Sequence, residues 1–388
     1  MRTTPSILLL AAGTFAVGTD AFIVSAFLPA MAHDLSVTLS TAGQSVTVFA
    51  LAYALLAPPI AAVTATLLPP RRLLAIALAL LAVANLGSAL APGFGLLLAT
   101  RVLAAAAAGA YSPAAAAAAA ALVPAAQRGR ALAIVIGGLS VATAVGVPLG
   151  HLASQWMGWR AALAGVAGLC LLVAAGLALA LPALARPAAV PLRARLQVLR
   201  LAAVHRILPL TVLGMAAAYA PYAFVVPLLE SWSIAGGSVT AMLMAYGAGA
   251  VFGNVASGSA TDRWGSAPGL LCAYAALAVV FGGLALLGTA PRFGSWWLVA
   301  ALMFCWGTAS WSQSPAQIHR LIAAAPRSGP VVVALNASAI YAGMAVGTGI
   351  GGVAMGWGPR AVPVAAALLA LAALLYAWMS LASVRAHQ

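Results

Sequence analysis

Twelve apolar segments of about 20 to 30 residues follow one another along the chain, separated by short stretches that contain arginine, proline or glycine. Their approximate bounds are 7–30, 43–67, 73–91, 95–123, 131–154, 160–181, 207–229, 239–261, 267–289, 295–318, 331–355 and 361–383. A helix needs about 20 mostly apolar residues to cross the hydrocarbon core of a bilayer, so each segment predicts one transmembrane α-helix. A transmembrane β-barrel is excluded, because its strands alternate polar and apolar residues in runs of about ten.

The composition agrees with a membrane protein, since 64% of the residues are hydrophobic and 6% are charged, whereas about a quarter are charged in soluble domains. Twelve spans need about 240 of the 388 residues, which leaves room for short connections. One connection, 183–206, is polar and rich in arginine. We therefore expect two six-helix bundles, 1–182 and 207–388, joined by a linker at 183–206 on the cytoplasmic surface.

All 18 basic side chains are arginines, and they gather in alternate connections. With the N-terminus in the cytoplasm, fourteen lie inside, Arg160, Arg292 and Arg360 lie outside, and Arg101 falls within the fourth helix. The positive-inside rule therefore predicts that both termini are cytoplasmic. This placement accounts for the net charge of +14 without nucleic acid, whose recognition would need a soluble basic surface.

Asp20 stands out among the four carboxylates because it lies inside the first apolar segment. A charge at that depth costs at least about 2.5 to 3.5 kcal/mol, so its default role is functional. Counted at about 1.5 Å per residue, Asp20 lies roughly 15 Å and Arg101 roughly 9 Å from the outer ends of their helices. The two depths differ by less than the reach of an arginine side chain.

The cysteines predict no metal site. Cys170, Cys272 and Cys305 occur singly in three helices, without Cys-x-x-Cys or Cys/His spacing. The polar residues form no nucleophile and base pair and no phosphate-binding loop, which argues against an enzyme and against a bound cofactor. An alternative of a different class is a membrane receptor or intramembrane enzyme that does not transport, and it would need a signalling domain or a catalytic cluster.

The eighth segment ends with Gly258-Ser259-Ala260-Thr261-Asp262-Arg263-Trp264-Gly265, on the predicted cytoplasmic side. Glycines permit an abrupt turn and a close helix approach, while Asp262 can accept hydrogen bonds from the first amides of another helix. The pattern resembles the G-x-x-x-D-R-x-G signature of the major facilitator superfamily. Gly258, Asp262, Arg263 and Gly265 stand at its defining positions.

The fifth segment contains Gly137-Gly138 and then Gly146-Val147-Pro148-Leu149-Gly150. Closely spaced glycines let helices approach, and Pro148 removes one backbone hydrogen bond. The pattern resembles the antiporter motif of proton-coupled drug exporters, represented here by Gly138, Gly146, Pro148 and Gly150, although glycine and proline are common in membrane helices generally. Glycines recur six helices later, in the eleventh segment, at Gly343, Gly347, Gly349, Gly351 and Gly352.

The first hundred residues show the most detailed likeness. The matching stretches are Gly18-Thr19-Asp20-Ala21-Phe22, Leu28-Pro29, Asp34-Leu35, Ala42-Gly43-Gln44 and Tyr53-Ala54-Leu55. Together they resemble the bacterial arabinose-efflux-permease and chloramphenicol-resistance branch of the twelve-helix drug:proton antiporters. Arg101, with Gly109 and Pro113, is similar to that group's fourth-helix motif, although Ala104 stands where glutamine is expected. Gly158-Trp159-Arg160 also recurs in these exporters.

The resemblance implies an all-α fold with two pseudo-symmetric six-helix halves and a substrate site at their interface near mid-membrane. It implies a monomeric transporter in a bacterial inner membrane that exchanges protons for a small drug-like or metabolite molecule by alternating access. A facilitator or sugar exporter that ignores protons is the nearer alternative, because the second carboxylate of some relatives is absent.

Asp20 and Arg101 are the residues that the resemblance assigns to proton coupling, since the first and fourth helices of such transporters both line the central cavity. Desolvation favours the protonated acid, whereas a nearby guanidinium favours the carboxylate. Opening to either side would change both effects, so Asp20 could load and release at most one proton per cycle. The alternative is a static ion pair that only fixes packing.

The substrate is expected to be neutral, zwitterionic or weakly anionic, because Arg101 offsets the charge of Asp20. It would bind through aromatic and amide groups near mid-membrane. The candidate cavity residues are Phe27, Phe49, Tyr219, Tyr222, Trp306 and Asn336.

The first-half copy of the signature loop lacks its acid, since Arg71 and Arg72 follow an uncharged stretch from 61 to 70. The resemblance implies that these loops latch the cytoplasmic side in the outward-facing state. We therefore expect this cytoplasmic gate to depend on Asp262, with Arg128, Arg130 and the start of the fifth helix as partners.

Overall fold

The computed structural model describes residues 3–185, 193, 197–287 and 296–385, and the regular elements in them are all helical. In chain order they are α1 (Thr3–Ile23), η1 (Val24–Ala26), α2 (Leu28–Asp34), α3 (Leu39–Leu67), α4 (Pro70–Ala89), α5 (Phe94–Ala121), η2 (Ala125–Gln127), α6 (Arg128–Val141), η3 (Ala142–Gly146), α7 (Val147–Ala180), α9 (Ala202–Tyr219), η4 (Tyr222–Phe224), α10 (Val225–Ser231), α11 (Gly237–Trp264), α12 (Ser266–Leu287), α13 (Trp296–Ala324), η5 (Pro326–Ser328), α14 (Gly329–Met355) and α15 (Ala361–Arg385).

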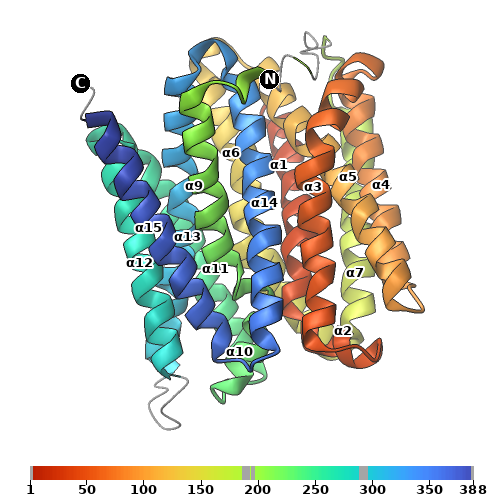
Figure 1. Cartoon of the computed structure of the whole chain (residues 1–388). Helices are drawn as coiled ribbons and strands as arrows, with labels where there is room; N and C mark the ends of the chain where they lie inside the picture. The colour runs from red at the N-terminus through yellow and green to blue at the C-terminus, as the bar shows by residue number, and fades with distance from the viewer. Residues whose placement is uncertain (1–2, 186–192, 194–196, 288–295, 386–388) are drawn as a thin grey trace.

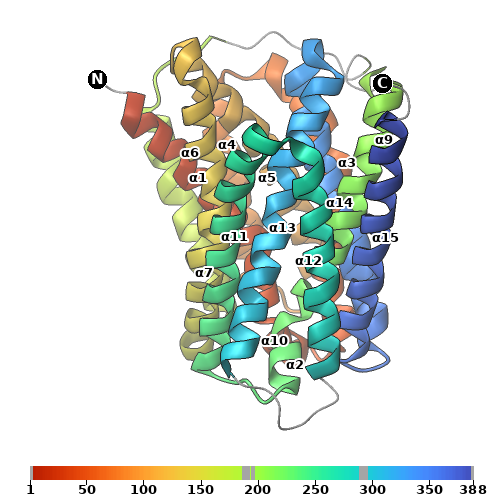
Figure 2. The same ribbon diagram turned by 90° about the vertical axis from the view of Figure 1, so that its left-hand side faces the viewer.

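The prediction of twelve membrane-spanning helices is confirmed. Ten helical stretches of the described chain are long and apolar enough to span a bilayer, and one of them, 128–180, has 53 residues. That stretch turns back at Gly158, whose φ of 82° and ψ of 160° are not helical, so it provides two spans. The more polar α13 runs the full height of the bundle beside α11 and α12 and makes the twelfth (Figure 2).

The first and seventh segments were predicted as continuous helices, and this is wrong, because each helix breaks near its C-terminal end. The chain leaves α1 at Ile23, passes through η1 and resumes as α2, and in the same way α9 gives way to η4 and α10. Pro29 lies in the first turn of α2, and Pro221 lies directly before η4. Proline lacks an N–H group and clashes with the preceding turn, which explains both interruptions. Their matching positions are the first sign of pseudo-symmetry between the halves.

The fifth predicted helix also departs from regular geometry. Its middle, η3, is a π-helix, and Pro148 follows two residues after it. Without an N–H group at position 148, the carbonyl of Ala144 has no α-helical donor, so the ladder must be locally rearranged. Single π-turns inside α-helices are frequent at functional sites.

Helix α1 begins and helix α15 ends at the same end of the bundle, which we call the terminal end (Figure 1). Helices α2 and α10 lie at the other end, which we call the distal end. Helix α9 begins at Ala202, so the last five positions of the predicted linker 183–206 are helical rather than linker. Part of that linker, 186–192 and 194–196, lies outside the described residues, and the division into 1–182 and 207–388 stays a prediction.

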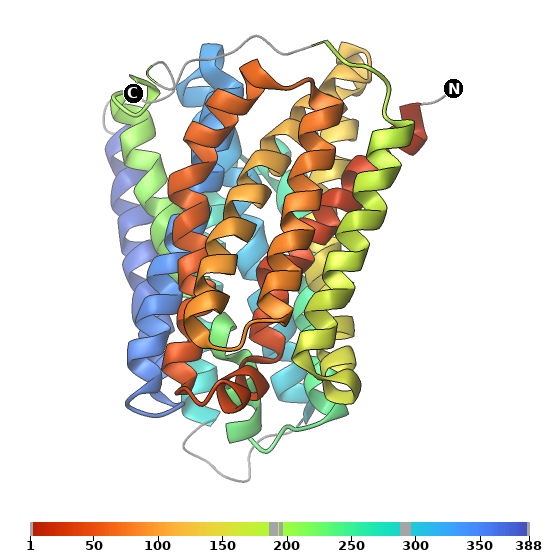
Figure 3. The ribbon, with the colours of Figure 1, turned by 90° about the vertical axis from the view of Figure 1, so that its right-hand side faces the viewer.

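The two sets of six spans pack side by side. Figure 2 shows α11, α13 and α12 on one side of the bundle, and Figure 3 shows the first-half helices, in orange to yellow-green, on the other. Helix α3 packs along α14, and α11 packs against α6, η3 and α7. These two seams join the halves.

Exposed tryptophans lie toward both ends of the bundle. At the distal end, Trp156, Trp297 and Trp357 are 85%, 76% and 81% exposed, and at the terminal end Trp264, the last residue of α11, is 66% exposed. Tryptophan is enriched where a membrane meets water, because its ring is apolar and its N–H is polar. The distal end of the bundle therefore coincides with one membrane interface.

Candidate functional site

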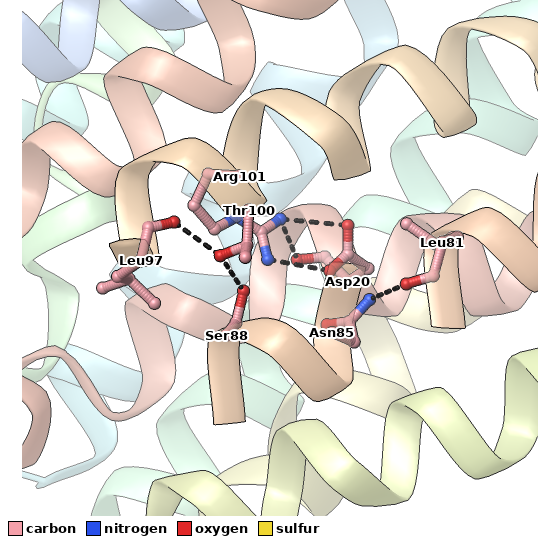
Figure 4. A network of polar contacts seen from close by, with 7 residues as sticks. All are labelled: Asp20, Leu81, Asn85, Ser88, Leu97, Thr100 and Arg101. Atoms are coloured by element: carbon pink, nitrogen blue, oxygen red, sulfur yellow. Dashed lines mark hydrogen bonds and ion pairs between the residues drawn. The ribbon is translucent and has the colours of Figure 1, made fainter. Parts of the chain in front are cut away.

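Asp20 and Arg101 form a direct ion pair at the centre of the first-half helices (Figure 4). The Nη1 atom of Arg101 lies 2.9 Å from Oδ1 of Asp20, and its Nη2 atom lies 3.0 Å from Oδ2. A guanidinium and a carboxylate joined by two parallel bonds make the strongest geometry available to such a pair. The side chains of Asp20 and Arg101 are 0% and 1% exposed, so in this conformation the pair is closed off from lipid and from bulk solvent.

Two buried polar atoms at this pair have no hydrogen-bond partner. Asn85 of α4 lies beside Asp20 (Figure 4), and while its amide nitrogen donates to the Leu81 carbonyl at 3.0 Å, its Oδ1 has no partner. The Nε atom of Arg101 is also buried without a partner. The ring of Phe49 covers the guanidinium, with its centroid 4.7 Å from Cζ. Unpaired buried polar groups are costly, so they mark a place where water, a proton or a ligand can bind.

The predicted antiporter motif holds α1 close to the fifth span. Three of its glycines lie where a Cβ atom would overlap α1: Gly138 against Ala11, Gly146 against Thr19 and Gly150 against Ile23. These contacts lie on both sides of Asp20 along α1. The motif therefore sets the position of the helix that carries the acid, and Pro148 shapes the π-turn between the first two contacts.

An aromatic cluster of Phe22, Tyr219, Tyr222, Tyr246 and Trp306 joins the two halves. Phe22, two residues after Asp20, has its ring centroid 6.0 Å from Tyr219 and 6.1 Å from Tyr222. Tyr222 then packs on Tyr246 at 4.9 Å, and Tyr246 on Trp306 at 5.1 Å. The hydroxyl of Tyr222 is buried and has no hydrogen-bond partner.

The structure brings three of the six predicted cavity residues together and places a fourth on the ion pair. Phe49 lies on the ion pair, and Tyr219, Tyr222 and Trp306 belong to the aromatic cluster. The other two lie elsewhere. Phe27 packs on Trp159, with 6.2 Å between ring centroids, and Asn336 accepts a hydrogen bond from Thr211 at 3.0 Å, between α14 and α9.

Sequence reasoning missed several residues of this region. Phe22 and Tyr246 complete the aromatic cluster, and Tyr53 stacks on Tyr341 across the halves with ring centroids 3.8 Å apart. Phe22 could have been found from its place two residues after Asp20. Contacts such as Tyr53 with Tyr341 leave no signal in a single sequence, because they join helices far apart in the chain.

The halves are closed at the distal end along the seam between α3 and α14. The Thr47 and Thr348 hydroxyl oxygens are 2.8 Å apart, and the Ser40 hydroxyl donates to the Gly352 carbonyl at 2.8 Å. Along the second seam, the amide of Asn254 donates to the Ser140 hydroxyl at 3.2 Å.

The predicted gate residues lie at the terminal end and form no ion pair with one another. They are Gly258, Asp262, Arg263 and Gly265 at the end of α11, with Arg128 and Arg130 at the start of α6. Gly265 has a φ of 80°, which favours glycine and ends the helix abruptly. Asp262 is exposed and forms no ion pair within the described chain.

A second ion pair, not predicted from the sequence, lies at the distal end of the first half. The Nη2 atom of Arg160 is 2.9 Å from Oδ2 of Asp34, and the indole of Trp159 donates to the same oxygen at 3.1 Å. Arg160 also donates to the carbonyl of Ala91 at 3.2 Å. This cluster ties α2, the end of α4 and the start of the sixth span together. Gly158-Trp159-Arg160 and Asp34-Leu35 were the available signals.

Comparison with known families now decides the classification, because a model of the Major Facilitator Superfamily matches residues 10–329. The chain belongs to the major facilitator superfamily. It is 34% identical to a chloramphenicol resistance protein of Streptomyces lividans over 346 residues, 87% of this chain and 86% of that relative. It is 30% identical to the inner membrane transport protein YdhP of Escherichia coli (strain K12) over 383 residues, 98% of this chain and 97% of that relative.

A solved structure of a D-xylose-proton symporter has the same fold, with a TM-score of 0.80 at 14% identity over 97% of this chain and 98% of that one. The predicted family and fold are therefore confirmed. This member of the superfamily is a multi-pass membrane transporter with a small-molecule substrate. In the part of the chain that the structure describes, no three His, Cys, Asp or Glu side chains are grouped as metal ligands.

Proposed function

We propose that this transporter exports a small drug-like or metabolite molecule from bacterial cells in exchange for protons, as a monomer in the inner membrane. The observation that carries the proposal is the fully buried pair of Asp20 and Arg101, joined by two hydrogen bonds at the centre of the bundle. A buried ionisable group in a membrane is expensive and marks a proton or ion pathway by default. The likeness to a chloramphenicol resistance protein supports the export direction.

The proposed orientation places the terminal end of the bundle in the cytoplasm. Its support is the arginine count, fourteen on that side against three on the other. With this orientation, the hydrogen-bonded contact between α3 and α14 lies toward the outside, and Asp262 on the cytoplasmic side forms no ion pair within the described chain. These are two features expected of an inward-facing conformation in the alternating-access cycle.

The proposed proton step takes place at the carboxylate of Asp20. In the present conformation the guanidinium of Arg101 stabilises the charged acid, and the surrounding helices exclude water. When the halves open to the outside, hydration and the position of α5 relative to α1 change, and Asp20 accepts a proton. The unpaired Oδ1 of Asn85, beside Asp20 in Figure 4, is suited to accept a hydrogen bond from the protonated acid.

The proposed substrate site is the aromatic cluster together with Phe49. It carries no net charge, because Arg101 offsets Asp20, so it suits a neutral, zwitterionic or weakly anionic molecule. Rings of the cluster offer apolar area, and the unpaired hydroxyl of Tyr222 offers one hydrogen bond. Selective binding of a permanent cation would contradict this charge balance.

The proposed gate uses Asp262 as its acidic member. In the outward-facing state, Asp262 would approach Arg128, Arg130 and the first amides of α6, where a carboxylate is favoured by the helix dipole. Replacing Asp262 with Asn should lower the outward-facing population, which spin-label distances between α6 and the end of α11 report. Unchanged distances together with unchanged transport would exclude the latch.

Proteoliposomes with an imposed pH gradient test the coupling directly. Wild-type protein should drive uphill movement of substrate, and Asp20→Asn should abolish this movement while sparing substrate exchange. Asp34→Asn is the matched control, because Asp34 also pairs with an arginine but lies half exposed at the distal end. It should keep uphill transport.

Two outcomes separate the alternatives. If wild-type protein equilibrates substrate but never concentrates it under a pH gradient, the protein is a facilitator and the proton assignment is wrong. If Asp20→Asn still concentrates substrate, coupling exists but resides elsewhere.

A further inference from the structure

An apolar groove runs along the outer surface between α14 and α15. Its volume is about 450 Å³, and its lining is almost entirely apolar: Ala345, Val346, Gly349, Ile350, Val353, Ala354, Trp357 and Ala365. Alanine and glycine at four of these positions leave the space that larger side chains would fill. In Figure 1 the two helices converge at the distal end, close to α10.

A second cleft adjoins the groove at the distal end. It has a volume of about 190 Å³ and is lined by Ser231, Trp232, Trp357, Gly358, Pro359 and Arg360. Trp357 lines both spaces, so the two form one site with an apolar part and a polar head. Trp357 is 81% exposed and belongs to the row of tryptophans at the membrane interface.

The dimensions of the groove match one leaflet of a bilayer. Ala345 and Ala354 are nine positions apart on α14, which corresponds to roughly 14 Å at 1.5 Å per residue, and Trp357 follows in the turn after the helix. Half of a typical hydrocarbon core is about 15 Å thick. The groove therefore extends from the interface to about mid-membrane, the depth that one acyl chain occupies.

The charge of the polar part points to an anionic headgroup. Arg360 is exposed and forms no ion pair with any described carboxylate, and this includes Glu230 just before the cleft residue Ser231. Its first-half counterpart in sequence, Arg160, is neutralised by Asp34. A guanidinium binds phosphate oxygens through paired N–H donors, and Trp232 and Trp357 beside it carry indole N–H donors.

We propose that this groove and cleft bind one anionic phospholipid from the leaflet at the distal end, with an acyl chain between α14 and α15 and the phosphate on Arg360. Helix α14 also packs on α3 and α9, so the bound lipid contacts a helix at the seam between the halves. The proposal depends on the membrane fold and is independent of proton coupling and of substrate identity.

Native mass spectrometry of the full-length protein in detergent tests the site, with phosphatidylglycerol and phosphatidylcholine of the same acyl chains as probes. Wild-type protein should bind phosphatidylglycerol with about fivefold higher affinity than phosphatidylcholine, which is the contribution of one arginine near an anionic surface. Arg360→Gln should remove this preference, and Arg360→Lys should keep it. Gly349→Leu should weaken the binding of both lipids, because the leucine side chain fills open space in the groove.

The matched control for the groove is Gly168→Leu, at an exposed position of α7 that also faces open space. This control should leave the binding of both lipids unchanged. If Arg360→Gln keeps the full preference for phosphatidylglycerol, or Gly168→Leu weakens lipid binding as much as Gly349→Leu, the assigned site is wrong. If Gly349→Leu changes only self-association in light scattering, the groove is a contact between copies of the protein and the lipid proposal fails.

Discussion

The two halves use the same device for close helix packing but differ at its centre. In the second half, glycines four residues apart on the unbroken α14 meet the backbone of α9 and of its C-cap residue: Gly343 at Val212, Gly347 at Ala216 and Gly351 at Ala220. In the first half, Gly138 meets the backbone of α1, whereas Gly146 and Gly150 meet side chains of α1, and η3 and Pro148 interrupt the helix between these glycines. Only the glycine contact of the first half involves an irregular helix, and that contact lies beside Asp20.

The halves also differ in what they place at mid-membrane. The first half contributes the charged pair of Asp20 and Arg101, whereas the described second half contributes buried aromatic rings. A buried charge in a membrane protein is costly and by default serves a function, whereas aromatic rings can be buried at little desolvation cost. We interpret this as a division of work, with proton handling in the first half and much of the substrate contact in the second.

Breaking the charged pair should have the largest effect on stability. Arg101→Gln leaves the buried Asp20 without its partner, and removing one partner of a buried ion pair typically costs about 3–5 kcal/mol. The double variant Asp20→Asn/Arg101→Gln removes both charges and should recover most of this loss. Thermal unfolding of the purified protein in detergent measures both. A double variant as unstable as Arg101→Gln would show that the arginine stabilises the fold through packing rather than through the pair.

Adding one methyl group to a glycine contact in each half should lower stability by an intermediate amount and sharpen the comparison. Gly146→Ala meets the Thr19 side chain, whereas Gly347→Ala meets the Ala216 backbone. Overpacking of this kind costs about 1–3 kcal/mol. Thr19→Ala should therefore rescue the stability of Gly146→Ala.

The corresponding pair in the second half is its control. Ala216→Gly removes no backbone atom, so it should not rescue Gly347→Ala. Thermal unfolding of the four variants decides between the two kinds of contact. Equal rescue in both halves would mean that the seams respond by moving whole helices, and the contrast between side-chain and backbone contact would be lost.

The spans were predictable because hydropathy is local. A run of apolar residues specifies a helix in lipid whatever its neighbours are, and the observed helices begin and end within several residues of the predicted bounds. The breaks after Ile23 and Tyr219 were missed, although Pro29 and Pro221 were visible, because proline is tolerated in many membrane helices, as at Pro58 in α3.

The site was predictable only in part. The Asp20 and Arg101 pair could be proposed because rare charges at similar depth have few other partners. Phe27 and Asn336 were placed with the cavity residues on chemical type alone, and side-chain type does not say which face of a helix turns inward. The Asp34 and Arg160 pair needed knowledge of how α2 folds back beside the sixth span, which is tertiary information.

Removing single hydroxyls should produce the smallest stability change and separate substrate contact from packing. Tyr222→Phe deletes a buried hydroxyl that has no partner, so unfolding should change by less than about 0.5 kcal/mol or shift toward higher stability. Tyr111→Phe is the control, because its hydroxyl donates to the Leu10 carbonyl at 2.9 Å and its loss should cost about 1 kcal/mol. If the Tyr222 hydroxyl binds substrate, Tyr222→Phe raises the KM for transport while Tyr111→Phe leaves it unchanged. Equal KM values for both variants and the wild type would remove Tyr222 from the substrate site and leave the aromatic cluster as packing between the halves.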